Sequence, residues 1–392
     1  MPALSKRITT LNGDGSDGWD VFYRARDMVA AGEPVIELTI GEHDIRTDPA
    51  ILAAMSESAA GGHTGYAVVP GVTALRDAIA ARVQARTGVP TERDNVLVTP
   101  GGQAGLFAAH MAVCQPGDTA AYVDPYYATY PGVVRSASAI PRPVATRSAD
   151  GFRPQKTILQ AACRGAASLL INTPNNPTGA VYPLETLQGI ADVCIEQDIW
   201  LISDEVYDTQ VWEGTHVSPR ALPGMAERTL VIGSMSKSHA MTGSRIGWII
   251  GPKDAIASLI DLATNTTYGV PGFIQDAALF ALNTEPLEAQ VAAPFLRRRG
   301  IAERVIGSQQ IVRMIPAQGA MYVMLDVRAT GMDGEAFANA LLDQHRIAVM
   351  PGESFGASAA GHVRVAMTVD DARFEVALTT LVGFAAGLAQ AA

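Results

Sequence analysis

SMSKSHAMTGSRIGW, residues 234–248, is the stretch that decides the fold, because it places a lysine between two apolar runs. TLVIG (229–233) precedes it and RIGWIIG (245–251) overlaps its end, and both have the composition of buried strands. The chain has four lysines among its 29 basic residues, so a lysine at this position stands out. Burial disfavours the charged ammonium group and lowers its pKa. The segment therefore predicts that Lys237 presents a free amine near neutral pH.

A free amine near neutral pH is what Schiff-base chemistry requires. The alternative for this segment alone is that Lys237 buries its aliphatic stem at a strand end and keeps its charge in water. The rest of the chain has to decide between the two.

Apolar runs and amphipathic segments alternate through the middle of the chain. The strand-like runs cover 95–100, 119–125, 167–174, 199–205, 229–234 and 245–251, with helical patterns over 74–86 and 183–197. Continuous apolar strands separated by helices are typical of a mainly parallel sheet that is covered on both faces. Ligands of such sheets bind beyond the carboxyl ends of the strands. The polar residues that follow these runs should therefore gather at one edge.

The pattern changes after about residue 285. A long helical stretch (285–308) leads into MYVMLDV (321–327), a further helix (333–345), HVRVAMTV (362–369) and a final alanine-rich helix. This order predicts a smaller α+β domain of residues 285–392, on which residues 1–45 return to pack. The large domain then comprises residues 46–284.

Composition narrows the class of protein. With 48% hydrophobic and 17% charged residues, the chain should be well buried and globular. A net charge of −10 argues against a nucleic-acid surface, and no apolar run approaches the roughly 20 residues that span a bilayer. The amino terminus has no apolar segment typical of a secretory signal. Cys114, Cys163 and Cys194 fit small core residues in a reducing compartment, so we expect a cytoplasmic location.

A phosphate cradle is suggested where Pro100-Gly101-Gly102-Gln103 follows a strand and opens a helical pattern. Free amides at a helix start bind phosphate, and glycines let the ligand approach closely. The alternative is a simple strand-to-helix turn. Arg245 has a planar fork that suits a phosphate, and Ser234 can add a hydroxyl.

Other candidate site residues follow other strands. Asp204 ends the run IWLISDE, and a buried carboxylate needs a cation, such as the protonated nitrogen of a pyridine ring. Its alternative is a helix cap. Tyr207 can donate a hydrogen bond to an oxygen of such a ring. Asn176 lies in NTPNNPTG (172–179), where a role in forming the turn is the alternative. Tyr127 can stack its aromatic face on a ring, and the alternative is that it is a core residue.

Together these residues describe a site for pyridoxal 5′-phosphate. From end to end the chain resembles the class I/II family of pyridoxal-phosphate aminotransferases of fold type I. NTPNNPTG, SDEVY and SMSKSHAMTGSRIGW occur in the family's order and at its spacing. The resemblance implies a large domain with a mainly parallel seven-stranded sheet, a smaller α+β domain and a homodimer.

The resemblance also implies a role for each matching residue. Lys237 would form the Schiff base with the cofactor and, once displaced by substrate, move a proton to and from the substrate Cα. Asp204 would keep the pyridine nitrogen protonated. Tyr207 and Asn176 would bind the ring oxygen, and Tyr127 would stack on the ring.

The phosphate and the substrate would have their own residues. Gly102, Gln103, Ser234 and Arg245 would hold the phosphate. Tyr66 would reach the phosphate in the neighbouring subunit. Arg364 would bind the α-carboxylate of the substrate, with Gly41 and Asn176 lining the substrate side.

Two departures from the family pattern concern specificity. GEHDIRTD (41–48) replaces the usual Gly-Glu/Asp-Pro-Asp-Phe pattern and brings His43 and Arg46 into that loop, and Ser244 replaces an aromatic residue. Segments 13–25, 214–229, 236–243, 268–278 and 352–364 are similar to arginine–pyruvate transaminases. A guanidinium substrate wants carboxylates near the pocket mouth, and the available ones are Asp14, Asp17, Asp20 and Glu42; the alternative is a solvated acidic turn.

We therefore predict an aminotransferase that moves an amino group from an L-amino acid, arginine among the candidates, to a 2-oxo acid such as pyruvate or 2-oxoglutarate. The alternative on the same fold is a carbon–sulfur β-lyase. The effector domain of a transcription regulator would need a DNA-binding module or a basic surface. GDGSDG (13–18) fits G-x-G-x-x-G, but no strand precedes it, and the seven histidines have no metal-ligand spacing.

Overall fold

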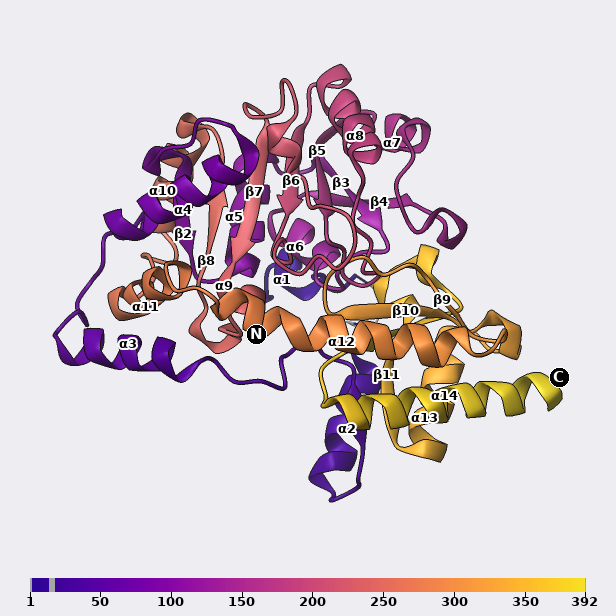
Figure 1. Ribbon diagram of the computed structural model, residues 1–392. Helices are drawn as coiled ribbons and strands as arrows, with labels where there is room; N and C mark the ends of the chain where they lie inside the picture. The colour runs from indigo at the N-terminus through magenta and orange to yellow at the C-terminus, as the bar shows by residue number, and fades with distance from the viewer. Residues whose placement is uncertain (1, 14–17, 392) are drawn as a thin grey trace.

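The computed structural model describes residues 2–13 and 18–391 and contains two sheets with helices packed on them (Figure 1). Within these residues, seven strands form the larger sheet, in the spatial order β2-β8-β7-β6-β5-β3-β4. Their bounds are β2 (Val96–Thr99), β3 (Thr119–Asp124), β4 (Ile140–Ala145), β5 (Ala166–Asn172), β6 (Trp200–Asp204), β7 (Thr229–Ser234) and β8 (Gly247–Ile250). Only β8 runs antiparallel to its neighbours. The predicted mainly parallel, seven-stranded sheet is confirmed.

The sequence pattern missed one strand of this sheet. β4 has the sequence IPRPVA, in which Pro141 and Pro143 cannot donate backbone hydrogen bonds. It lies at the sheet edge and pairs only with β3 among the described strands. An edge strand tolerates proline because one side of it needs no hydrogen-bonded partner. The six apolar runs identified from the sequence all form strands.

Helices cover both faces of the larger sheet, which explains why its strands are apolar throughout. One face packs on α5 (Gly102–Val113), α6 (Tyr130–Ser136) and α10 (Lys253–Thr264). The other face packs on α3 (Pro49–Ala60), α4 (Thr73–Thr87), α7 (Lys156–Ala162), α8 (Leu184–Glu196) and α11 (Gly272–Leu282). Side chains of β7 alternate between these layers: Leu230 and Ile232 point to the first and Val231 to the second.

The smaller sheet has the order β1-β11-β12-β10-β9. Its strands are β1 (Ile36–Leu38), β9 (Arg313–Met314), β10 (Tyr322–Asp326), β11 (Ile347–Pro351) and β12 (His362–Ala366), and its helices are α2 (Asp20–Ala30), α13 (Gly334–His345) and α14 (Asp371–Ala391). β1 joins the sheet parallel to β11, and the remaining pairs are antiparallel. The short helix α1 (Lys6–Thr9) contacts α6.

One long helix connects the two parts. α12 (Leu287–Gly307) begins with Leu287 in a core of the larger sheet and continues with Phe295, Ala302 and Ile306 in the core of the smaller sheet. Figure 1 shows it running from α9 (Met235–Ser238) along the smaller sheet. The domain boundaries near residues 45 and 285 stay a prediction.

The carboxyl-terminal helix α14 is an exception to our expectation that no apolar run is long enough to span a bilayer. By length and composition it is the one helix in the described chain that is apolar enough to cross a membrane. Its Phe374, Leu378 and Leu381 are buried in the core of the smaller sheet. These residues form the face of the helix that packs on the sheet, and 33% of its apolar stretch is buried.

Candidate active site

A cavity of about 510 Å³ lies at the carboxyl ends of the strands of the larger sheet, between the two sheets. Among the predicted site residues that line it are Gly41, Gly102, Gln103, Tyr127, Asn176, Asp204, Tyr207, Ser234, Lys237, Arg245 and Arg364. Of the residues that were assigned a role in catalysis or in binding the cofactor or the α-carboxylate, Tyr66 is the one that does not line it. Topology brings these side chains together, since they are spread over more than 300 residues of sequence.

Lys237 lies in α9, directly after β7, and its side chain is directed into the cavity. Its Nζ donates a hydrogen bond to the carbonyl of Gly41. Burial lowers the pKa of Lys237 to about 8, with a further contribution from Arg364, while Glu42 acts in the opposite direction. A lysine with this pKa is mostly ammonium at pH 7 and half free amine near pH 8, well below the range of an exposed lysine.

Asp204 ends β6 and is a buried carboxylate. The Tyr130 hydroxyl donates to its Oδ2 at 2.6 Å, and the backbone N–H of Val206 donates to its Oδ1 at 3.3 Å. Burial raises the pKa of Asp204 to about 6, and the Tyr130 hydrogen bond opposes that rise. Within the described chain Asp204 forms no ion pair with Lys, Arg or His, so it suits a cation supplied by a ligand.

Arg364 projects from β12 of the smaller sheet and is only 1% exposed. Its Nη1 donates to Oδ1 of Asn176 at 2.9 Å, and its Nη2 donates to the carbonyl of Thr39. The guanidinium lies 4.4 Å from the ring centre of Tyr322 and 4.3 Å from that of Phe355. No carboxylate of the described residues pairs with it, and its Nε has no hydrogen-bond partner. A buried cation without a counter-ion favours binding of an anionic group.

The start of α5 forms a cradle with Arg245. Gly101, the residue before α5, has φ +82°, and a Cβ atom there would stand 2.3 Å from Arg245 Nη2. Arg245 itself has φ +51°, a left-handed conformation that directs its guanidinium toward the helix start. Ser234 caps α9 and accepts a hydrogen bond from the Ser236 amide at 3.0 Å. Amides, a guanidinium and a hydroxyl around one space suit a phosphate.

Aromatic side chains complete the cavity, and sequence reasoning missed most of them. Tyr127 packs edge-on against Tyr130 with ring centres 5.9 Å apart. The hydroxyls of Tyr207 and Tyr322 lie 3.1 Å apart, and burial raises the pKa of Tyr207 well above its ordinary value. The residues that we did not predict are Trp19, Phe22, Tyr23, Tyr130 and Tyr322. Tyr130 is the third tyrosine of DPYYATY, which was the available signal for it.

Several other predicted residues lie outside the cavity or at its rim. Tyr66 is 92% exposed and contacts the ring of Tyr268. Glu42 lines the cavity, whereas Asp20 starts α2 and does not line it. Asp14 and Asp17 lie outside the described residues. In the departing loop, His43 Nε2 lies 3.0 Å from the backbone carbonyl of Lys237.

The residues present fit pyridoxal 5′-phosphate. The site offers a lysine with a lowered pKa, a buried carboxylate without a cation, a phosphate cradle and a pair of tyrosine hydroxyls that can bind an oxygen of the ring. An arginine without a counter-ion stands on the opposite wall for a substrate carboxylate.

Comparison with known proteins agrees with this arrangement. The sequence model of the family described as aminotransferase class I and II matches residues 33–381. An arginine–pyruvate transaminase of Pseudomonas aeruginosa is 41% identical over 360 residues, which are 91% of this chain and 91% of that protein. An aspartate/prephenate aminotransferase of Thermus thermophilus is 33% identical over 384 residues, 96% of this chain and 97% of that protein.

Solved structures show the same relationship. The aspartate aminotransferase of Thermus thermophilus with maleate superposes with a TM-score of 0.90 and is 31% identical, covering 97% of this chain and 100% of that chain. An aspartate aminotransferase of Thermotoga maritima gives a TM-score of 0.91 at 29% identity over 97% of this chain and 99% of that chain.

Proposed function

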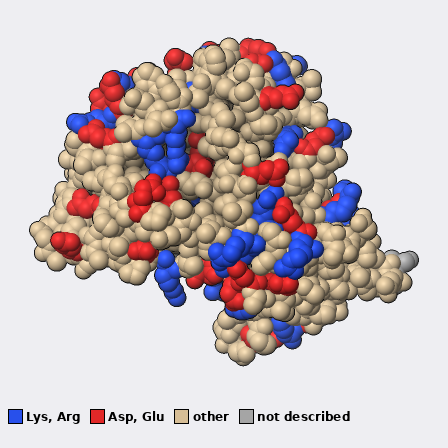
Figure 2. Space-filling model, viewed as in Figure 1, with Lys and Arg blue, Asp and Glu red and all other residues tan. Residues whose placement is uncertain are grey.

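Because the chain belongs to the class I and II aminotransferase family, we propose that it uses pyridoxal 5′-phosphate to move an amino group from an L-amino acid to a 2-oxo acid such as pyruvate or 2-oxoglutarate. The relatives named above are aminotransferases, and the alternative of a carbon–sulfur β-lyase has no support from them. A transcription regulator is also disfavoured, since acidic and basic side chains are interspersed on the face in Figure 2.

The observation that carries the proposal is that the amine of Lys237 and the guanidinium of Arg364 share one cavity. The lysine comes from the larger sheet and the arginine from the smaller one. An amino acid bound to Arg364 through its carboxylate would therefore have its amino group in the cavity that Lys237 also lines. This is the arrangement that exchange of an amino group requires.

We assign the cofactor to the wall of the larger sheet. Asp204 would bind the ring nitrogen, Tyr207 and Asn176 the ring oxygen, and Tyr127 the ring face. The phosphate would be held by Gly102, Gln103, Ser234 and Arg245. When bound, the cofactor supplies an electron-withdrawing ring that stabilises the charge left on the substrate Cα after proton loss.

Lys237 is then the residue that holds and moves the proton. A lysine with a pKa of about 8 can take a proton from the substrate Cα and return it at neutral pH, because both of its forms are populated. Tyr130 keeps Asp204 ionised by its hydrogen bond, so that the carboxylate can accept a cation.

Arginine is the donor that we propose to test first. The relative that is 41% identical is named for arginine and pyruvate. The cavity is lined by three cations, Lys237, Arg245 and Arg364, and each is assigned above to the cofactor or to the substrate's α-carboxylate. Glu42 also lines the cavity and has no such assignment, so its carboxylate can bind the guanidinium of an arginine donor. Aromatic faces such as Trp19 also attract a guanidinium.

We further propose a cytoplasmic homodimer with a large domain of residues 46–284 and a small domain of residues 1–45 and 285–392. Tyr66 is 92% exposed, and Tyr268 and Val68 near it are also exposed. Large exposed apolar side chains are typical of an interface. In the dimer, Tyr66 would reach the phosphate of the neighbouring subunit.

An absorbance scan from about 300 to 500 nm tests the function. We expect the purified protein to show the visible band of bound pyridoxal 5′-phosphate and to lose it when the true donor is added. Arginine, aspartate, alanine and phenylalanine form the panel, and a 2-oxo acid should restore the band.

Release of ammonia and pyruvate in place of band recovery would show lyase chemistry instead. Failure to bind the cofactor at all, at concentrations that saturate an aspartate aminotransferase run in parallel, would reject the proposal.

A further inference from the structure

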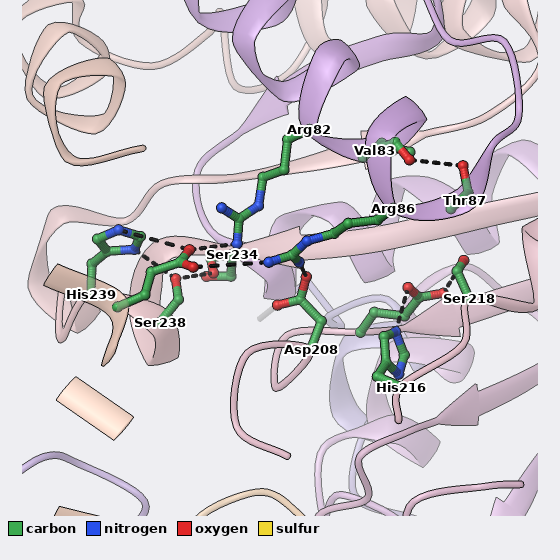
Figure 3. Close-up of polar contacts among 12 residues, drawn as sticks. Arg82, Val83, Arg86, Thr87, Asp208, His216, Ser218, Ser234, Ser238 and His239 are labelled. Atoms are coloured by element: carbon green, nitrogen blue, oxygen red, sulfur yellow. Dashed lines mark hydrogen bonds and ion pairs between the residues drawn. The ribbon is translucent and has the colours of Figure 1, made fainter. Parts of the chain in front are cut away.

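Four charged side chains form a cluster on the face of the larger sheet that α4 covers (Figure 3). Arg82 and Arg86 are four residues apart on α4 and therefore share one side of the helix. Arg82 Nη2 donates to Glu288 Oε1 at 2.5 Å, and Arg86 Nη1 donates to Asp208. Arg86 Nη2 also lies 3.9 Å from Glu288 Oε2. The four groups form a network rather than two isolated pairs.

The network lies next to segments of the chain that carry two residues of the active site, Tyr207 and Lys237. Asp208 directly follows Tyr207 in the chain. On the other side, His239 is two residues beyond Lys237, and its Nε2 lies 3.9 Å from Glu288 Oε1. The Ser238 hydroxyl lies 2.8 Å from His239 Nδ1. In the tautomer with a proton on Nε2, Nδ1 accepts from Ser238, whereas Nε2 has no hydrogen-bond partner among the described residues, so His239 packs beside Glu288 without bonding to it.

The third attachment is to the connecting helix. Glu288 is the second residue of α12, whose later residues lie in the core of the smaller sheet. That sheet carries Arg364 on β12. The two arginines of α4 therefore bind two segments directly, the turn after Tyr207 and the start of α12, and the segment after Lys237 packs beside Glu288 through His239.

The environment gives these ion pairs more weight than exposed ones. The side chains of Arg82, Arg86, Asp208 and Glu288 are 21%, 40%, 26% and 27% exposed, and His239 is fully buried. Burial lowers the pKa of His239 to about 4, so the histidine is neutral at pH 7. Two guanidiniums then balance two carboxylates. Partly buried pairs in a network are screened less by solvent than single surface pairs.

We propose that Arg82 and Arg86 are positioning residues for the transamination reaction, which fix Glu288 and Asp208 and so set the placement of Lys237 and Tyr207 against Arg364. The inference rests on the proposed function, since it concerns the geometry of that same site. Reacting groups displaced by about 1 Å can lose on the order of 100-fold in rate. Loosening this network of charged side chains should therefore lower kcat.

The test compares Arg82→Gln, Glu288→Gln and the exchange of charges in Arg82→Glu with Glu288→Arg. We expect each Gln variant to lower kcat about tenfold with KM changed less than threefold, and the exchange variant to recover most of that loss. Arg93→Gln is the matched control. Arg93 pairs with Asp77 of α4, with 2.6 Å between Nη2 and Oδ2, and this pair is not part of α12 or of the cavity lining. It should change kcat by less than twofold.

Hydrogen exchange of the loaded protein gives a second measurement that does not depend on turnover. Faster exchange at residues 206–210 and 287–291 in both Gln variants, but not in Arg93→Gln, is expected. Unchanged kcat and unchanged hydrogen exchange in folded Gln variants would overturn the proposal. A charge-swapped Arg82→Glu, Glu288→Arg variant that folds but has no higher kcat than Arg82→Gln would also overturn it. If the unmodified protein shows no transamination, the proposed function fails, and the exchange data alone decide whether the network holds these segments.

Discussion

The two walls of the active-site cavity differ in how they are built. The wall of the larger sheet consists of residues at strand ends, such as Asp204 after β6 and Lys237 after β7. The wall of the smaller sheet combines Arg364 and Tyr322 of neighbouring strands with the segment around Gly41 and the start of α2. The first wall is assembled by one sheet, whereas the second needs parts of the chain that are up to about 340 residues apart.

This difference separates the residues that we propose carry out the reaction from those that we propose select the substrate. Parallel strands with rigid ends place the groups that we propose hold the cofactor and move protons. The other wall contributes the guanidinium of Arg364, which we propose binds the substrate carboxylate, and aromatic side chains that line the cavity. Variants of the first wall should therefore lower kcat, and variants of the second wall should mainly change KM and the preferred substrate.

The largest effect is expected from Lys237→Ala. Loss of the amine removes both the covalent link to the cofactor and the proton carrier, so kcat should fall by at least ~10³-fold. Melting followed by circular dichroism should show a folded protein, because Nζ has one hydrogen-bond partner, the Gly41 carbonyl. Lys253→Ala, which removes a lysine that is 55% exposed, is the control. Turnover within tenfold of the unmodified protein would remove Lys237 from its role.

Arg364→Ala tests the other wall. It should raise KM for the amino donor, because it deletes a charged hydrogen-bonding group worth on the order of 2–4 kcal/mol, or about 30- to 1000-fold. Steady-state kinetics with an amino acid and with the amine that lacks its carboxylate measure the effect directly. The preference for the amino acid should disappear in the variant. Equal preference before and after the change would show that Arg364 does not bind the carboxylate.

The contrast between the walls also explains how far the sequence could be interpreted. An apolar run that ends in a polar residue is a local signal, and it predicted Asp204, Ser234 and the strands that carry them. β4 was missed because its prolines contradict strand propensity, and only its place at the edge of the sheet makes them tolerable. The seven-stranded sheet itself came from resemblance rather than from pattern.

Residues of the second wall gave no comparable signal. Tyr322 lies in an apolar strand and Trp19 directly precedes the amphipathic helix α2, so both have the pattern of core residues. Three tyrosines occur in DPYYATY, and the orientation of α6 decides that Tyr130 is the one that reaches Asp204. Tyr66 belongs to neither wall in one chain, and its role in a partner's site stays a prediction.

Gly41→Ala probes the packing within the wall of the smaller sheet and should have an intermediate effect. A Cβ atom there would stand 1.7 Å from the Tyr322 hydroxyl and 3.2 Å from the Met321 sulfur. Overpacking of this kind costs about 1–3 kcal/mol. We expect kcat/KM to fall about tenfold, with partial recovery when Tyr322→Phe is added. Gly300→Ala, where nothing lies within 4 Å, should leave kcat/KM unchanged, and an equally silent Gly41→Ala would contradict the contact.

The smallest expected effect is electrostatic and connects one wall to the other. In the cofactor-free protein the pKa of Lys237 is about 8; Arg364 lowers it and Glu42 raises it. The free amine is the reactive form, so the rate of pyridoxal 5′-phosphate uptake should rise with pH and reach half its maximum near pH 8. Glu42→Gln removes the carboxylate that favours the ammonium form, and the midpoint should move to lower pH by up to about one unit.

Arg364→Met provides the opposite sign within the same experiment. It removes a positive charge that disfavours the ammonium form of Lys237, so the midpoint of uptake should move to higher pH. Absorbance-monitored uptake across pH 6 to 10 on the three proteins gives both shifts. Opposite shifts would show that the wall that selects the substrate also tunes the amine on the wall that performs the chemistry. Shifts of the same sign would mean that the two substitutions act by changing the solvation of Lys237 rather than its charge environment.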